Sequence, residues 1–143
     1  MKIVVDTNVL VSATCWTGTP RELLRLAFEG RFRAIVSREM FAEYIDVIHR
    51  EKFSCFDGRA LKRFTRILEE SVEIIKAGPE QKVIAEDPSD DKVLSCAKAA
   101  RADLIVTGDE HLLKLRKWNG IRIISPRQTI EMIGSAKRRK WFK

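Results

Sequence analysis

Cysteine and histidine are scarce in this sequence. Its 143 residues include two histidines and three cysteines, Cys15, Cys55 and Cys96, which share no CxxC or other metal-like spacing. An odd number of widely separated cysteines is typical of buried thiols in a reducing compartment, not of a disulfide framework. The sequence therefore predicts neither a disulfide-stabilised scaffold nor a zinc site, and it favours a cytoplasmic location.

Long hydrophobic runs are also missing. No stretch approaches the roughly 20 apolar residues that a membrane-spanning helix needs. Asp6 interrupts the N-terminal apolar stretch too early for a signal peptide. We expect neither a signal peptide nor association with a membrane.

Negative charge is absent from the C-terminal end. The last seven residues, KRRKWFK, contain five basic residues and no acidic one, so residues 1–136 carry only +2 of the formal net charge of +7. From the length and this bias we expect one folded domain over residues 1–134 and a basic C-terminal tail over residues 135–143. A basic tail on a weakly charged domain indicates an anionic partner.

Strand-like and helix-like segments alternate along the chain. Short apolar runs predict strands at Ile3–Val5, Phe32–Val36, Val72–Ile75, Leu104–Val106 and Ile121–Ile124. The segments between and after them predict helices over residues 20–29, 38–50, 57–70, 91–101, 110–115 and 126–133. Such alternation is typical of a single-domain, three-layer α/β/α fold with a central, mostly parallel sheet.

Three helix starts have recognisable capping residues. In Thr19-Pro20-Arg21-Glu22, we expect Thr19 to cap the helix and Glu22 to complete a capping box. Ser37 is the predicted cap of the next helix, and Ser125-Pro126-Arg127-Gln128 repeats the cap-plus-proline pattern before the last one.

Two aspartates follow predicted strands. Asp6 comes directly after the first strand, and Asp109 lies three residues after Leu104–Val106. An ionised carboxylate in an apolar environment costs several kcal/mol unless it is paired or binds a cation. Asp6 therefore either marks the end of its strand or meets a positive group, whereas Asp109 also suits a turn in Thr-Gly-Asp. Asn8 either forms a local turn or fixes Asp6 through a hydrogen bond.

Three further acids lie on predicted helices. At about 100° per residue, Glu43 falls on the shoulder of the apolar arc of its helix, whereas Glu39 and Asp46 lie further toward solvent. Glu43 is thus the acid of that helix best placed to lean into a crevice, and a solvated edge residue is the alternative. Asp90 and Asp91 occupy a helix start, where the helix dipole tolerates negative charge and where acids are common without any function.

The positions of these acids converge on one edge of the predicted sheet. In parallel sheets, ligands bind beyond the carboxyl ends of the strands. Several acids at that edge repel one another unless a cation neutralises them. Oxygen ligands with few His or Cys residues indicate Mg²⁺ or Mn²⁺ rather than Zn²⁺.

Four segments together resemble the PIN-domain ribonucleases, and among them the toxin components of toxin–antitoxin pairs. They are Asp6-Thr7-Asn8-Val9-Leu10, Glu43 within SREMFAEYIDV, DPSDDKVLSCA and TGDEHLL, in the family's order, and the resemblance covers nearly everything to Pro126. It implies that an acidic quartet holds Mg²⁺ or Mn²⁺ and cleaves RNA. The residues that match this quartet are Asp6, Glu43, Asp91 and Asp109.

The resemblance also bears on neighbouring positions. Asp91 fits the family's Asp-x-x-aliphatic helix start better than Asp90, which remains the second candidate metal ligand. Recurrent supporting polar positions match Asn8, Ser37 and Thr107. His111 is a departure, because relatives often have a second Asp there, and it puts the second metal position in doubt. The expected partners are an RNA substrate, a small antitoxin protein and a second copy of the chain.

Two basic segments are candidate RNA-binding surfaces. In the predicted helix 57–70, four basic residues share an arc of about 100° opposite the apolar face, which is either a solvated surface or a ridge that contacts phosphates. These residues are Arg59, Lys62, Arg63 and Arg66. In the tail, Lys137, Arg138, Arg139 and Lys140 precede Trp141 and Phe142, aromatic residues that can stack on unpaired bases. A loose terminus without function is the alternative.

The function that we expect is a metal-dependent endoribonuclease that cleaves RNA as the toxin of a toxin–antitoxin pair. An aspartyl-phosphate phosphatase is an alternative because Asp6 follows the first strand, although that chemistry usually needs a second Asp where Asn8 stands. A second alternative is a nucleic-acid or partner-binding module that keeps the acidic pocket without turnover.

Overall fold

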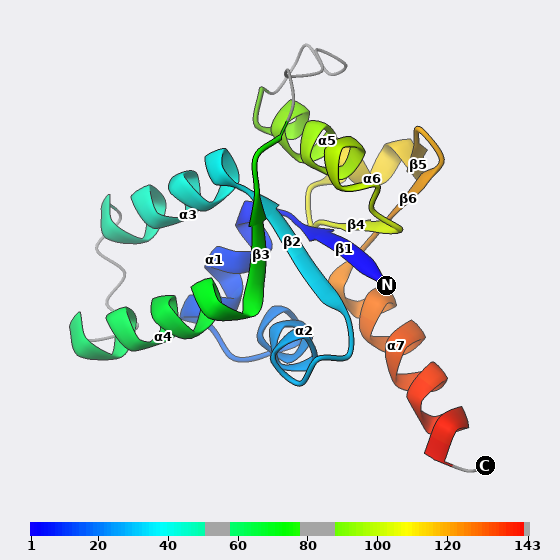
Figure 1. Cartoon of the computed structure of the whole chain (residues 1–143), viewed down its shortest axis with the longest axis horizontal. Coiled ribbons are helices and arrows are strands. Elements are labelled where there is room, and N and C mark those ends of the chain that lie inside the picture. The colour runs from blue at the N-terminus through cyan, green and yellow to red at the C-terminus, as the bar shows by residue number, and fades with distance from the viewer. Residues whose placement is uncertain (51–57, 78–87, 142–143) are drawn as a thin grey trace.

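A single mixed sheet forms the centre of the computed structural model, which describes residues 1–50, 58–77 and 88–141 (Figure 1). Within these residues the sheet has six strands in the order β3-β2-β1-β4-β6-β5. The strands are β1 (Lys2–Val5), β2 (Arg33–Ser37), β3 (Val72–Ile75), β4 (Leu104–Val106), β5 (Lys117–Trp118) and β6 (Ile121–Ile124). All neighbouring pairs are parallel except β5 with β6, so the predicted mostly parallel sheet is confirmed.

Helices cover both faces of this sheet (Figure 1). They are α1 (Thr7–Cys15), α2 (Thr19–Phe28), α3 (Arg38–Arg50), α4 (Gly58–Ser71), α5 (Pro88–Ala100), α6 (Glu110–Leu115) and α7 (Pro126–Trp141). Helix α2 packs against α1 and α7, whereas α5 packs against β1, β2 and β4. The predicted three-layer arrangement is therefore confirmed. None of the helices in the described ranges is long and apolar enough to cross a membrane.

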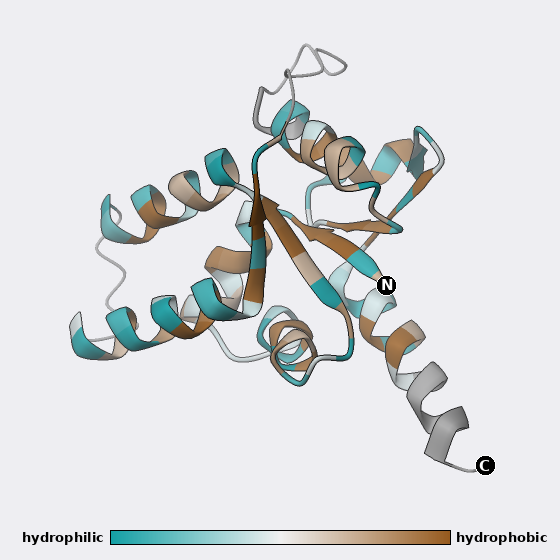
Figure 2. Cartoon of the chain, in the orientation of Figure 1, coloured by the Kyte–Doolittle hydropathy of each residue, from teal (hydrophilic) through white to brown (hydrophobic). Residues whose placement is uncertain are grey.

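The central strands are apolar on both faces because helices bury both. Ile3, Val4 and Val5 of β1 are fully buried, as are Ile105 and Val106 of β4, and Figure 2 shows these strands in the hydrophobic colours. The pairing of Val5 with Val106 places the residues that follow β1 and β4 side by side. This register brings Asp6 and Thr107 together at the carboxyl edge of the sheet.

Two of the three predicted helix caps are present in the structure. The Ser37 hydroxyl accepts a 3.1 Å hydrogen bond from the backbone N–H of Met40 at the start of α3. At the start of α7, the Gln128 N–H donates to the Ser125 hydroxyl at 3.2 Å, and the Ser125 N–H donates to the Gln128 side chain at 3.0 Å. This reciprocal pair is a capping box, and it fixes the direction in which α7 leaves β6.

The capping prediction for α2 was wrong. Thr19 is already helical, the cap position is Gly18, and no side chain caps this end. Gly18 adopts a φ of +125°, which favours glycine, so the chain turns into the helix one residue earlier than Thr19 would require. Glu22, the expected partner in the capping box, pairs instead with Arg25.

Other differences concern where helices begin and end. Helix α1 starts immediately after Asp6 and was not predicted, because its sequence is apolar around most of the helix and lacks a helical period. Helix α5 begins at Pro88, three residues before the predicted start. Helix α7 continues to Trp141 instead of ending near Ile133, so the boundary predicted at residue 134 falls inside a continuous helix. The short strand β5 was also not predicted.

Candidate active site

Asp6 lies in the short connection between β1 and α1. Its backbone N–H donates to the Val106 carbonyl of β4 at 3.0 Å, and its own carbonyl accepts the first helical hydrogen bond of α1, from Val9 at 3.0 Å. The residue is 6% exposed. Hydrogen bonds to the sheet and to the helix therefore fix the backbone of Asp6 on both sides.

The Thr107 side chain is the direct partner of this carboxylate. The Thr107 hydroxyl, which is completely buried, donates a 2.6 Å hydrogen bond to Asp6 Oδ2. The same hydroxyl oxygen accepts from the backbone N–H of Asp109 at 3.0 Å. The backbone of Thr107 is itself held by the Ile124 carbonyl of β6 at 3.1 Å. One hydroxyl thus connects the aspartate after β1 to the aspartate after β4.

Asp109 occupies the N-cap of α6. Its Oδ1 accepts a 2.9 Å hydrogen bond from the backbone N–H of His111, and its carbonyl accepts from the Leu113 N–H at 2.9 Å. The position therefore has a structural role as a helix cap. Capping occupies one carboxylate oxygen, so a role as cap does not prevent the second oxygen from binding another group.

The electrostatic environment of Asp6 disfavours its charged form. Burial raises the pKa of Asp6 above its ordinary value, and hydrogen bonds from Thr107 and from the backbone N–H of Asn8 act in the opposite direction. The negative charges of Asp109 and Glu43 raise this pKa further. Two acids remote in sequence thus lie close enough for their charges to act on Asp6, as expected for a site that binds a cation.

Glu43 and Asp91 lie on α3 and α5, two helices that pack against each other. The Glu43 side chain is 30% exposed, and its Oε2 lies 3.4 Å from the Lys92 ammonium. Asp91, the residue before Lys92, is 6% exposed. Glu43 is thus partly buried, and it lies close enough for its charge to act on Asp6.

The remaining candidate residues differ in position. Ser37 is buried and caps the helix that carries Glu43. Asn8 is exposed, and its effect on Asp6 comes from its backbone N–H. His111 is exposed on α6 and donates its backbone N–H to Asp109. The Asp90 side chain lies outside the described part of the structure.

The donor chemistry of this region fits a hard divalent cation. Carboxylate oxygens are the ligands that Mg²⁺ and Mn²⁺ prefer. The carboxylate of Asp6 is buried, and no positively charged side chain is among the described groups that shift its pKa. Among the described residues, no group of three His, Cys, Asp or Glu side chains is arranged closely enough to hold a metal ion as it stands. The acids are therefore near one another but not drawn together into a coordination shell.

The basic face of α4 has the geometry predicted from its sequence. Arg59, Lys62, Arg63 and Arg66 are exposed, and Leu68 on the opposite side of the helix is completely buried. The side chains of residues 137–143, which contain the other predicted RNA-binding residues, lie outside the described part of the structure. Their backbone forms the end of α7 as far as Trp141, which extends away from the sheet in Figure 1.

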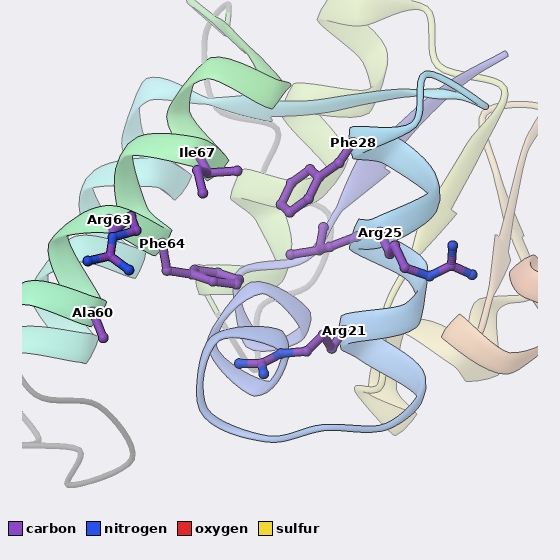
Figure 3. Close-up of a pocket in the computed structure, with 8 residues that line it drawn as sticks. Arg21, Arg25, Phe28, Ala60, Arg63, Phe64 and Ile67 are labelled. Atoms are coloured by element: carbon purple, nitrogen blue, oxygen red, sulfur yellow. The ribbon is translucent and has the colours of Figure 1, made fainter.

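The sequence did not reveal an apolar groove between α2 and α4 (Figure 3). Its volume is about 420 Å³, and its lining includes Phe28, Phe64 and Ile67. Phe28 and Ile67 are 37% and 42% exposed. The Arg21 guanidinium lies 5.5 Å from the centre of the Phe64 ring while it donates to the Ala13 and Thr14 carbonyls at the end of α1. Only the packing of two helices remote in sequence creates this groove, so no local pattern could have indicated it.

The fold and the acids at the carboxyl edge of its sheet define an α/β protein with a candidate site for a divalent cation. The family model described as "PIN domain" matches residues 2–111, so the chain belongs to the PIN-domain family. PIN domains as a family are nucleases, which hydrolyse phosphodiester bonds. The matched segment contains Asp6, Glu43, Asp91 and Asp109.

Solved structures support the same fold. VapBC2 from Rickettsia felis, whose crystal structure is bound to a DNA fragment from its promoter, has a TM-score of 0.64 and 18% identity, covering 87% of this chain and 98% of that one. PAE2754 from Pyrobaculum aerophilum has a TM-score of 0.64 and 14% identity, covering 94% of this chain and 90% of that one. No curated protein matches the sequence.

Proposed function

We propose that this protein is a metal-dependent endoribonuclease whose metal ligands are Asp6, Glu43, Asp91 and Asp109. The observation that carries the proposal is the environment of Asp6, a buried carboxylate near the charges of Glu43 and Asp109. Such an arrangement is unfavourable by itself, because burial and like charges both oppose ionisation. A bound divalent cation would favour the ionised carboxylates, and such a cation is consistent with membership in a family of nucleases.

Each residue has a distinct task in this site. The four acids would hold Mg²⁺ or Mn²⁺, which when bound would supply polarisation of the phosphate and activation of a water. Thr107 fixes the rotamer of Asp6, and Asp109 uses its cap position to present a carboxylate at a defined helix start. Glu43 approaches from α3, whose start Ser37 fixes. Asp91 is the proposed ligand from α5, with Asp90 as the second candidate.

RNA is the proposed substrate. An anionic polymer suits a chain with a net charge of +7 whose body carries exposed basic residues along α4. The basic C-terminal segment, including Trp141, adds charge and an aromatic side chain for contacts with unpaired bases. Single-stranded RNA exposes both its phosphates and its base faces to such a surface.

We further propose that the protein is the toxin of a toxin–antitoxin pair. The structural likeness to VapBC2 supports this role. A small antitoxin would inhibit the enzyme by placing an Arg or Lys side chain among the acids, where its charge replaces that of the cation. The exposed apolar groove between α2 and α4 is a surface that a protein partner covers favourably. A second copy of the chain, in a homodimer, is another partner that could cover this groove.

The aspartyl-phosphate phosphatase alternative receives no support from the comparisons, because the matching family is that of the PIN domains. In addition, the Asn8 side chain lacks the acid–base group that this chemistry needs. A binding module without turnover remains a defined alternative, and it predicts RNA binding without cleavage.

The experiment that tests the proposal is cleavage of defined substrates by the purified protein. End-labelled single-stranded RNA, double-stranded RNA and single-stranded DNA of the same sequence are incubated with Mg²⁺, Mn²⁺ or chelator. We expect internal cleavage of single-stranded RNA with either cation and none with chelator. Cleavage that persists in chelator would exclude the metal-dependent mechanism, and binding without cleavage would favour the non-catalytic module.

A further inference from the structure

We propose that Lys92 is a positioning residue that pairs with Glu43 when no cation is bound. In this arrangement the Lys92 ammonium holds Glu43 away from the coordination shell and releases it when Mg²⁺ or Mn²⁺ binds. The inference rests on the proposed function, because it concerns the same cation. It predicts that Lys92 lowers metal affinity while it stabilises the metal-free protein.

The first observation is the ion pair itself. Lys92 Nζ lies 3.4 Å from Glu43 Oε2, and the two side chains are 38% and 30% exposed. Lys92 follows Asp91, the proposed ligand on α5, directly in the sequence. Its ion pair with Glu43, the proposed ligand on α3, therefore links the two helices. A positive side chain therefore contacts one of the acids whose cation we propose.

The second observation is that the acids are not arranged as a coordination shell. No three described carboxylate, imidazole or thiolate side chains are close enough to hold a metal ion as they stand. Glu43 nevertheless lies near enough for its charge to raise the pKa of Asp6. A carboxylate that is near Asp6 but engaged by Lys92 must change partner before it can coordinate a cation.

Charge and geometry give the two states different partners for Glu43. Without a cation, the single charge of the ammonium offsets part of the repulsion among the acids. With a cation, two positive charges at the acids attract Glu43 more strongly than one ammonium does, and Lys92 can extend into solvent because it is partly exposed. The cation must therefore displace Lys92 and then tolerate its positive charge nearby, and both effects weaken binding.

Two other roles for Lys92 are open to test. The first is an ordinary surface ion pair, which would contribute little to any property of the site. The second is a direct contact between Lys92 and the RNA phosphate, which would affect cleavage without affecting binding of the metal alone. The experiment therefore measures binding of Mn²⁺ in the absence of RNA.

The test compares Lys92→Met with Lys98→Met by calorimetric titration with Mn²⁺. Lys98 is exposed on the same helix, in its last turn, and supplies a matched loss of one positive charge. We expect Lys92→Met to bind Mn²⁺ about 3–10-fold tighter than wild type, and Lys98→Met to stay within about twofold, since screening weakens distant charges. Lys92→Arg, which keeps the charge, should remain close to wild type.

A double-mutant cycle shows whether the effect acts through Glu43. In a Glu43→Gln background, Lys92→Met should raise Mn²⁺ affinity less than it does in the wild-type background, because the competition for Glu43 is gone and only the repulsion between Lys92 and the cation remains. In chelator, Lys92→Met should melt about 1–3 °C below Lys98→Met, because Glu43 then lacks its counter-charge.

Several results would overturn the proposal. Equal Mn²⁺ affinities for Lys92→Met and Lys98→Met reduce the ion pair to a surface contact. Unchanged Mn²⁺ affinity with impaired RNA cleavage assigns Lys92 to the substrate and leaves the proposed function intact. Failure of the wild type to bind Mn²⁺ at all rejects both the inference and the metal-dependent function.

Discussion

The Thr107 hydroxyl donates to the Asp6 carboxylate at 2.6 Å and accepts from the Asp109 backbone N–H at 3.0 Å. Residues from the ends of β1 and β4 are thereby joined through a single buried side chain. The parallel register that pairs Val5 with Val106 makes this contact geometrically available. The carboxyl edge of the sheet thus positions its acids through the fold's own hydrogen bonds.

The first prediction concerns this hydroxyl. Thr107→Val keeps the volume but removes the hydrogen bond to Asp6, so we expect metal-dependent cleavage to fall about 10–100-fold, as is typical when support of a metal ligand is lost. Thr129→Val is the matched control, because Thr129 is equally buried and its hydroxyl donates at 2.8 Å to the carbonyl of Ser125, the residue before α7. Cleavage rates that fall equally in the two variants would refute a specific role for Thr107.

The second prediction concerns the cost of the buried charge. Because burial raises the pKa of Asp6, the folded state holds this proton more tightly than the unfolded state. The resulting stabilisation is present at low pH and is lost as the pH rises from about 4, the unfolded value, through the raised folded value. In chelator, Asp6→Asn should therefore be more stable than wild type at neutral pH, and the advantage should shrink toward pH 4.

Urea denaturation across this pH range measures the difference. Asp103→Asn provides the control, because Asp103 is exposed at the opposite end of β4, where its carboxylate accepts from the Lys2 N–H at 2.8 Å. A free energy of unfolding for Asp6→Asn that stays below the wild-type value at every pH would show that Asp6 is not under electrostatic strain.

The third prediction concerns stabilisation by cations. At 100 times Kd, Mg²⁺ or Mn²⁺ should stabilise the protein by about 2.7 kcal/mol, or about 5–10 °C in melting temperature. Asp109→Asn should reduce this gain, since Asn can still cap α6 but lacks the negative charge. Thermal denaturation with and without cation tests both points. A wild-type melting temperature that does not respond to either cation would contradict the site.

How much of this could be read from the sequence depends on the range of the interactions. The cap-plus-proline pattern at Ser125 predicted a helix cap correctly, because the Ser125 hydroxyl and the Gln128 N–H that donates to it lie close together in the sequence. Thr19 and Glu22 showed the same pattern, but the positive φ of Gly18 moved the helix start, and the prediction was wrong. A local residue pattern at Thr19 therefore did not predict the helix start, because it does not specify the backbone angles of the preceding glycine.

Contacts between distant segments were harder to predict. Asp6 stood out because an apolar strand leads directly into it, and the family resemblance selected Glu43, Asp91 and Asp109 from the other acids that the sequence pointed to. The link from Thr107 to Asp6 depends on β1 and β4 being neighbours. The pairing of Lys92 with Glu43 depends on the packing of α3 against α5. Neither relation has a local sequence signal.

The fourth prediction concerns the basic end of α7. Replacing Lys137, Arg138, Arg139 and Lys140 with Gln should weaken RNA binding mainly at low salt and flatten the log–log salt dependence by about 0.7 for each phosphate that the protein no longer neutralises. Cleavage of saturating RNA should persist. Binding at several salt concentrations, together with the melting temperature, checks the prediction. An unchanged salt dependence of RNA affinity rejects RNA binding by this segment. If the melting temperature also falls, the result favours packing of the segment against the protein.

The most direct test of the acidic site is the cleavage rate of Asp6→Asn on single-stranded RNA with Mn²⁺, compared with Asp103→Asn under the same conditions. Both variants exchange one Asp for Asn, but Asp6 is buried at the carboxyl edge of the sheet and Asp103 is exposed at the other edge. We expect Asp6→Asn to remain folded and to lose more than the roughly 100-fold typical of supporting residues, while Asp103→Asn cleaves at the wild-type rate. A folded Asp6→Asn protein that cleaves RNA at a near-normal rate would contradict the proposed active site.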